Sequence, residues 1–170
     1  MKILSLKLIL CLFVATSILS CSKNHDSKYY VKLKINGTWV TWEKAIGELG
    51  PDLANAAKTD FGVTANNDNS SDIFDLSIQV DGTNFNTGIY DSDNSNYLTL
   101  ISYSKDVTNT FKDYEIESKS GQPDARYLVN VTSITPTELR GTFTGNYLYD
   151  YFDDETLNVT EGEFFVRRAR

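Results

Sequence analysis

Two cysteines and one histidine are the residues with the widest chemical scope in this chain of 170 residues. Cys11 lies inside an apolar run, Cys21 stands where that run ends, and His25 follows in a polar segment. Nucleophilic catalysis needs a base beside the nucleophile, and a zinc site needs several His or Cys ligands. A single histidine among polar residues suits neither, and no glycine-rich phosphate-binding motif is present. We therefore predict no catalytic residue, no metal site and no cofactor.

The first twenty residues read as a secretion signal rather than as part of a fold. Lys2 and Lys7 give a positive start, and Leu8–Leu19 is an apolar stretch of 12 residues. A helix that crosses a bilayer needs about 20 residues, so this stretch is too short to span one. It has the length of the apolar part of a signal peptide. We expect residues 1–20 to be removed.

The end of that stretch, Ile18-Leu19-Ser20-Cys21, resembles the bacterial lipobox, in which cleavage precedes a lipid-modified cysteine. Each buried methylene of an attached chain adds about 0.8 kcal/mol of membrane affinity, so several chains anchor a protein without a membrane-spanning helix. We expect Cys21 to carry the lipid and residues 21–28 to form a flexible tether. A signal cleaved in the ordinary way and an uncleaved anchor are the alternatives.

Two pairs of glutamates have the spacing that carboxylate chemistry could use: Glu115 with Glu117, and Glu161 with Glu163. A glycosidase needs a carboxylic acid with a raised pKa and a second carboxyl group about 5–9.5 Å away. Residues two apart on a strand point to one face, and charges on the outer face of an antiparallel sheet are ordinary. We expect both pairs to be solvated, and a carboxylate-dependent glycan hydrolase stays as the less favoured alternative.

Acidic loops raise the question of calcium. The segment from Asp91 begins like a calcium loop, with Asp93 and Ser95 at the third and fifth positions. Its sixth position is Asn96 rather than Gly, and its twelfth is Ser102 rather than Glu, so an EF-hand is excluded. A looser site at Asp91 and Asp93, or in the second acidic loop, stays open at this point; the second loop contains Asp150, Asp153, Asp154 and Glu155.

Aromatic residues are the remaining candidates for a binding surface. Trp and Tyr combine flat apolar faces with polar tips, which suits a small molecule, a glycan or a protein partner. Trp39 and Trp42 are three positions apart on one expected strand, so at most one of them should be in the core. The candidate surface residues are Trp39, Trp42, Tyr147, Tyr149, Tyr151 and Phe152.

The elements that must position these side chains read as strands. Apolar and polar residues alternate in segments such as 31–35, 73–80 and 127–131, and Asn36-Gly37 between two such runs is a strong hairpin signal. Turn signals recur every 8–15 residues. We predict an all-β domain over residues 29–170, a single antiparallel β-sandwich or barrel of about 8–10 strands. Glycines and a proline in residues 43–58 predict a short helical or irregular insertion there.

This combination resembles a group of small uncharacterised lipoproteins of Bacteroidota. The resemblance rests on the lipobox, on the hairpin Lys34-Ile35-Asn36-Gly37-Thr38-Trp39, on Gly88-Ile89-Tyr90, and on the closing segments Leu139–Gly145 and Val159–Phe164. It covers most of residues 29–168. It implies an exported, β-rich domain and supplies no catalytic residue.

Charge and location complete the prediction. Without the leader the chain has 14 basic and 23 acidic residues, a net charge of −9. Such a surface repels nucleic acid, so no nucleic-acid partner is expected. We expect a non-enzymatic protein that binds a ligand or partner, anchored by lipid in the bacterial cell envelope, on the periplasmic or outer face of the outer membrane. The alternative is a structural or accessory subunit of an envelope assembly.

Overall fold

The structure, a computed structural model, describes residues 28–67, 70–94, 96–105, 112–117, 126–150 and 155–169. Every regular element within these residues is a β-strand, and there are eleven. The strands are β1 (Tyr30–Ile35), β2 (Thr38–Trp42), β3 (Lys44–Pro51), β4 (Lys58–Asn67), β5 (Ser70–Asp81), β6 (Gly88–Asp91), β7 (Tyr97–Lys105), β8 (Lys112–Glu117), β9 (Arg126–Ile134), β10 (Glu138–Asp150) and β11 (Glu155–Arg168). The predicted all-β fold is confirmed, with one strand more than the expected range.

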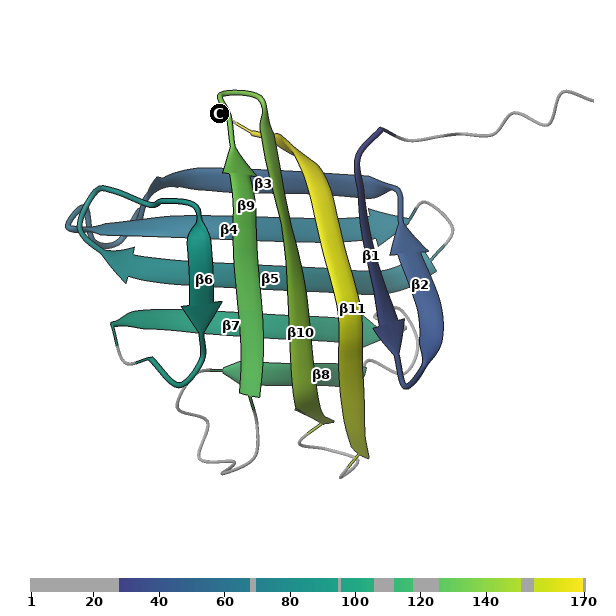
Figure 1. Cartoon of the computed structure of the whole chain (residues 1–170). Helices are drawn as coiled ribbons and strands as arrows, with labels where there is room; N and C mark the ends of the chain where they lie inside the picture. Colours follow the sequence, from purple (N-terminus) through teal and green to yellow (C-terminus); the bar gives the residue numbers. More distant parts are fainter. Residues whose placement is uncertain are drawn as a thin grey trace, which may run out of the picture.

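The strands form two layers that face each other (Figure 1). The front layer has the strand order β2-β1-β11-β10-β9-β6, and the back layer has the order β3-β4-β5-β7-β8. Strands of the front layer cross those of the back layer at a steep angle (Figure 1). The two layers enclose one core, as in orthogonally packed sheets.

Two corners join the layers into a nearly closed, barrel-like sheet. At one corner β11 pairs with β3 through Arg167 with Ile46 and Arg168 with Gly47. At the other corner β10 pairs with β8 through two residue pairs near the end of β10. The β11–β3 pairing is parallel whereas the neighbouring pairings are antiparallel. The sheet is therefore mixed, although its other strand pairings are antiparallel as predicted.

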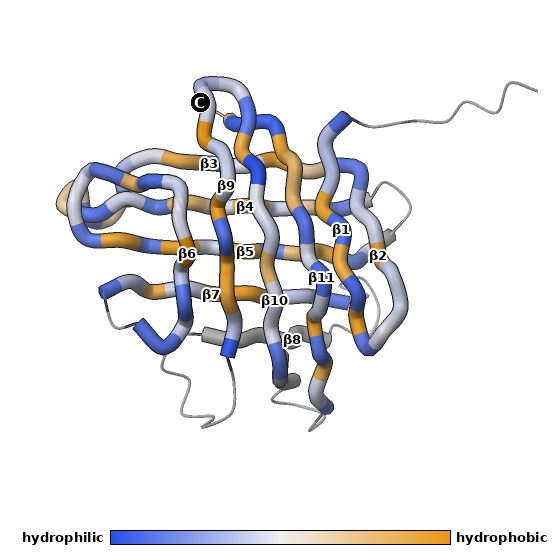
Figure 2. The backbone as a smooth tube through the Cα atoms, viewed as in Figure 1, coloured by the Kyte–Doolittle hydropathy of each residue, from blue (hydrophilic) through white to orange (hydrophobic). Residues whose placement is uncertain are grey.

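The hairpin at Asn36-Gly37 has the predicted form. Asn36 and Gly37 both have positive φ, 47° and 83°, which is the geometry of a two-residue hairpin turn whose twist suits the strands. Ile35 pairs with Thr38 on either side of the turn. Val31 and Leu33 are fully buried, as the alternation predicts. Hydrophobic and hydrophilic residues alternate along several strands of the front layer (Figure 2).

The predicted helical or irregular insertion over residues 43–58 is wrong for most of its length. Residues 44–51 form β3, which pairs with β4 from Lys44 with Asn66 to Pro51 with Thr59. Gly47 lies within this strand, and the packing there leaves no room for a side chain. A Cβ at this position would lie 2.6 Å from Val166 Cγ2 and 2.7 Å from Leu139 Cδ1. This glycine marks close packing at the corner with β11 rather than a chain break. Only the following residues, 52–57, form a turn region.

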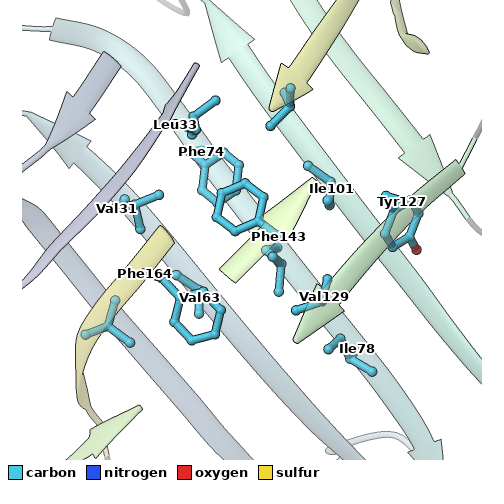
Figure 3. Close-up of a cluster of buried hydrophobic side chains, with 14 of the residues drawn as sticks. Val31, Leu33, Val63, Phe74, Ile78, Ile101, Tyr127, Val129, Phe143 and Phe164 are labelled. Carbon is cyan, nitrogen blue, oxygen red and sulfur yellow. The ribbon is translucent and has the colours of Figure 1, made fainter. Parts of the chain in front are cut away.

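Aliphatic side chains and aromatic rings together fill the space between the layers (Figure 3). Phe74 of the back layer stacks on Phe143 of the front layer with centroids 5.1 Å apart. Phe74 also contacts Trp42, which in turn contacts Tyr103. On the other side, Phe143 contacts Phe164, which contacts Phe61. Phe61 stacks in turn on Phe85 at 4.9 Å. Because such rings bury large apolar areas, they hold the two layers together without a disulfide.

Candidate functional site

The structure separates the two tryptophans as predicted. Trp42 is fully buried, whereas Trp39 is 45% exposed on the outer face of the front layer. Trp42 is thereby removed from the candidate surface and assigned to the core. The other candidates are not placed: the backbones of Tyr147 and Tyr149 lie in β10, but their side chains are outside the described part. Tyr151 and Phe152, together with Cys21 and His25, also lie outside the described residues.

Strand register brings side chains from all six front strands onto one outer face. Across the sheet the paired residues form a row, and the members of this row are Thr41, Lys32, Glu163, Thr142, Asn130 and Ile89. A second row lies two residues further along the strands, with Trp39 beside Lys34 at one end and Thr144, Leu128 and Asp91 at the other. These residues are remote in sequence, and only the fold makes them neighbours.

An open groove of about 480 Å³ follows these rows. Its apolar wall contains Trp39, Ile89 and Leu128, which are 45%, 67% and 37% exposed. Its polar lining consists of Asn130, Thr142, Thr144, Glu161 and Glu163. Volumes of about 300–1,000 Å³ with few polar groups placed among apolar ones are typical of ligand sites. We call this surface, together with its extension described next, the front groove.

The groove continues along the strands toward the ends of β9 and β10. A neighbouring hollow of about 380 Å³ shares Leu128 and Thr144 with the first. Its further polar lining comes from Arg126, Asn146, Asn158 and Thr160. The two hollows therefore form one elongated surface on β9, β10 and β11, which face the viewer in Figure 1.

A β-bulge in β11 shapes the middle of the groove. Phe143 pairs with Gly162 and Gly145 pairs with Val159, so two residues of β11, Thr160 and Glu161, face the single Thr144 of β10. Glu161 takes a φ of 53°, which is uncommon for a residue other than glycine. Bulges often lie beside functional sites because they change the direction of a side chain. Here the bulge keeps Glu161 exposed in the groove lining, next to Glu163.

Lysines of β1 hold one side of the groove. The Lys34 ammonium lies 2.5 Å from a Glu161 carboxylate oxygen and 5.0 Å from the centre of the Trp39 ring. The Lys32 ammonium lies 4.2 Å from the same ring centre. Such cation–π contacts contribute about 0.5–1 kcal/mol at exposed sites. Together they restrain the orientation of the one described tryptophan side chain that is open to solvent.

The second groove carboxylate, Glu163, is also engaged. The Tyr30 hydroxyl donates a hydrogen bond of 2.6 Å to Glu163 Oε1. This hydrogen bond, with partial burial and the nearby negative charge, raises the pKa of Tyr30 to about 12. Tyr30 therefore stays protonated and donates across the physiological pH range. Each glutamate of the predicted Glu161/Glu163 pair is thus held by its own neighbour; the side chains of Glu115 and Glu117 are not described.

One cation of the protein itself, Arg126, pairs with both aspartates of the calcium-like loop. The Arg126 guanidinium lies 2.5 Å from Asp91 Oδ2 and 3.3 Å from Asp93 Oδ2. The hydrogen bond from Arg126 lowers the pKa of the Asp91 carboxyl. In the described part of the chain, no three His, Cys, Asp or Glu side chains are grouped as metal ligands would be. The second acidic loop lies mostly outside that part.

Sequence reasoning identified Trp39 and considered the Glu161/Glu163 pair, but it missed the rest of the groove. Alternation in the strands of the groove was used only to identify the inward-facing residues. The groove instead uses outward-facing ones, namely Ile89, Leu128 and Asn130. A signal was present in the middle of β10, where three successive outward positions are Thr142, Thr144 and Asn146. A run of small neutral hydrogen-bonding side chains on an outer face is a usable hint.

Comparison with known proteins found no matching family model, no matching curated protein and no matching solved structure. In the described ranges, none of the secondary structure is a helix of the length and apolar character required to traverse a bilayer.

Proposed function

We propose that this protein is a non-enzymatic binding protein of the bacterial cell envelope, anchored by a lipid on Cys21, and that the front groove is its binding site. The observation that carries the binding site is the exposure of Trp39 beside a polar-lined groove of about 480 Å³. Large aromatic side chains are normally buried, so one that is restrained in the open beside a hollow indicates recognition.

Binding is favoured over catalysis by how the groove carboxylates are engaged. Glu161 pairs with Lys34, and Glu163 accepts a hydrogen bond from Tyr30. An acid catalyst of a glycosidase needs a carboxyl group that stays protonated, which burial in apolar surroundings provides. Both glutamates are exposed rather than buried in apolar surroundings, and each is engaged by a neighbouring side chain.

Occupancy of the groove is testable without knowledge of the ligand. Hydroxyl-radical labelling of intact cells is compared with labelling of the full chain purified in detergent. Trp39 and Leu128 should be labelled less in cells, while Leu53, which is fully exposed on the other side of the molecule, should be labelled equally. Equal labelling of Trp39 in both samples would contradict a binding role for the groove.

The anchor has a separate test. Cys21→Ser should abolish metabolic labelling of the protein with a fatty acid, and the uncleaved precursor should accumulate. The matched control is Cys11→Ser, which changes a cysteine of the predicted signal peptide and should be processed normally. Undiminished fatty-acid labelling of Cys21→Ser would remove the anchor and, with it, the envelope location from the proposal.

A further inference from the structure

Most of the polar side chains that line the front groove are neutral and carry hydrogen-bonding groups. Amides come from Asn130, Asn146 and Asn158, and hydroxyls come from Thr142, Thr144 and Thr160. Amide groups donate and accept at once, and hydroxyls do the same. A ligand that matches this lining must itself present many neutral groups that both donate and accept.

The charged groups in the lining argue against an anionic ligand. Glu161 and Glu163 contribute negative charge to the groove. Arg126 is the cationic residue of the described lining, and its guanidinium is already paired with Asp91 and Asp93. A phosphate, nucleotide or acidic sugar would meet these carboxylates on desolvation, which costs free energy. The Lys32 ammonium is near the groove but outside its lining, and it lies at the Trp39 ring.

The apolar residues of the lining supply the apolar complement. Trp39 lines the groove from β2, and Ile89 and Leu128 line it from β6 and β9. A pyranose ring has a face of C–H groups that packs on an aromatic surface, while its hydroxyls point to the sides. A protein partner instead would favour an interface centre of large apolar residues over a floor of Thr, Asn and Glu.

The length of the groove suits a chain of sugars. The outward residues Thr142, Thr144 and Asn146 follow one another on β10, and four residues of strand span about 13 Å. The two hollows, of about 480 Å³ and 380 Å³, meet at Leu128 and Thr144. The lining therefore continues beyond the reach of a single sugar ring.

From these features we infer that the front groove binds a neutral oligosaccharide, with one sugar ring packed on Trp39 and the following sugars hydrogen-bonded along β10. This inference rests on the proposed binding function of the same groove and names its ligand class. The Lys32 and Lys34 ammonium groups at the Trp39 ring keep the indole in place for stacking.

The test is a titration of the full chain, purified in a detergent without a sugar headgroup and measured by isothermal titration calorimetry. The probes are neutral tetrasaccharides of α- and β-linked glucose, of mannose, of galactose and of N-acetylglucosamine, with tetragalacturonate as the acidic probe. At least one neutral probe should bind with a Kd of about 1 mM or below, and at least about tenfold more tightly than tetragalacturonate.

Variants connect that signal to the groove. Trp39→Ala should lower the affinity for the best neutral probe by about tenfold or more, and Asn130→Ala should lower it by a few fold. Leu53→Ala, which removes another exposed apolar side chain, should leave it unchanged. Trp39→Phe, which keeps an aromatic face, should retain more affinity than Trp39→Ala.

Failure of every neutral probe, or equal binding of tetragalacturonate, would overturn the inference. If Trp39 is nevertheless protected in intact cells, the proposed binding function stands and only the ligand class is wrong. If neither protection nor probe binding is observed, both fall. Unchanged affinity in Trp39→Ala would likewise overturn the assigned position of the sugar.

Discussion

The Lys34 ammonium on β1 lies 2.5 Å from the Glu161 carboxylate on β11, and this ion pair joins a hairpin near the start of the domain to a bulged strand near its end. Lys34 also lies 5.0 Å from the centre of the Trp39 ring. One cation thus couples the orientation of the exposed indole to the conformation of the bulge. Strength at such an exposed pair is modest, so its role is positional rather than stabilising.

Replacement of Lys34 should therefore separate binding from stability. Lys34→Met keeps the apolar stem but removes the charge, so the free energy of unfolding should change by less than about 1 kcal/mol. Binding in the front groove should weaken by several fold because Trp39 and Glu161 lose a shared restraint. Denaturant unfolding and probe titration measure the two effects. Lys32→Met removes the other cation at the Trp39 ring but leaves the pair with Glu161 intact, so it should weaken binding less than Lys34→Met does.

The positive φ of Glu161 predicts how substitutions there behave. A side chain branched at Cβ is poorly tolerated in this conformation, and glycine adopts it freely. Glu161→Val should be less stable than Glu161→Gly by about 1–2 kcal/mol, measured by urea denaturation. Both variants lose the Lys34 pair, so the comparison isolates the backbone. Equal stability of the two variants would show that the bulge does not have this geometry.

Gly162 is predicted to be required for the close packing of β10 and β11. A Cβ at Gly162 would lie 2.5 Å from Phe143 Cε2 and 2.6 Å from the Phe143 carbonyl oxygen. Because the backbone oxygen cannot rotate away, Gly162→Ala should lower the free energy of unfolding by about 1–3 kcal/mol. Gly62→Ala is the control, since a Cβ there would meet nothing within 4 Å. A Gly162→Ala protein as stable as the control would contradict the packing between β10 and β11.

The two tryptophans should differ sharply on truncation. Trp42→Ala empties a fully buried site beside Phe74 and Tyr103 and should cost about 3–5 kcal/mol. Trp39→Ala removes an exposed ring and should cost less than about 1 kcal/mol. Chemical denaturation monitored by circular dichroism gives both values. A loss in Trp39→Ala as large as in Trp42→Ala would place Trp39 in the core and not on the surface.

The Asp91–Arg126 pair predicts a pH dependence of stability. The pKa of Asp91 is lowered in the folded state, so the pair stabilises the fold fully above the ordinary Asp pKa of about 3.9. That contribution disappears as the pH falls through the lower folded-state pKa. At about pH 7, Asp91→Asn should therefore be less stable than the native protein by about 0.2–1 kcal/mol. Denaturation across a pH series should show this difference vanishing in strong acid, and a difference that persists there would contradict the assignment.

Much of the fold could be predicted because the alternation of apolar and polar residues along a strand indicates which side chains face inward. Phe74, Leu76 and Ile78 alternate in sequence and are all buried in β5. The Asn36-Gly37 turn was readable because both positions need positive φ, which these residue types tolerate. The three-residue spacing of Trp39 and Trp42 was enough to separate surface from core.

What could not be predicted depends on contacts between distant strands. Gly47 looked like a chain break because its reason, the closeness of Val166 and Leu139, appears only when β3 meets β11. In β10 the buried positions shift from Phe143 to Leu148, across irregular pairing, and alternation alone carries no sign of that shift. The front groove likewise contains residues of β2, β6, β9, β10 and β11. The pairing register between these strands cannot be derived from a single sequence.

The most direct test of the central claim, that the front groove binds a neutral glycan at Trp39, uses the two indole N–H signals of the protein in a nitrogen-15 correlation spectrum. Trp39→Phe assigns them, and the best neutral tetrasaccharide is then titrated. We predict that the Trp39 signal shifts progressively and saturates while the signal of buried Trp42 stays in place. A titration in which the Trp39 signal does not move would contradict the claim.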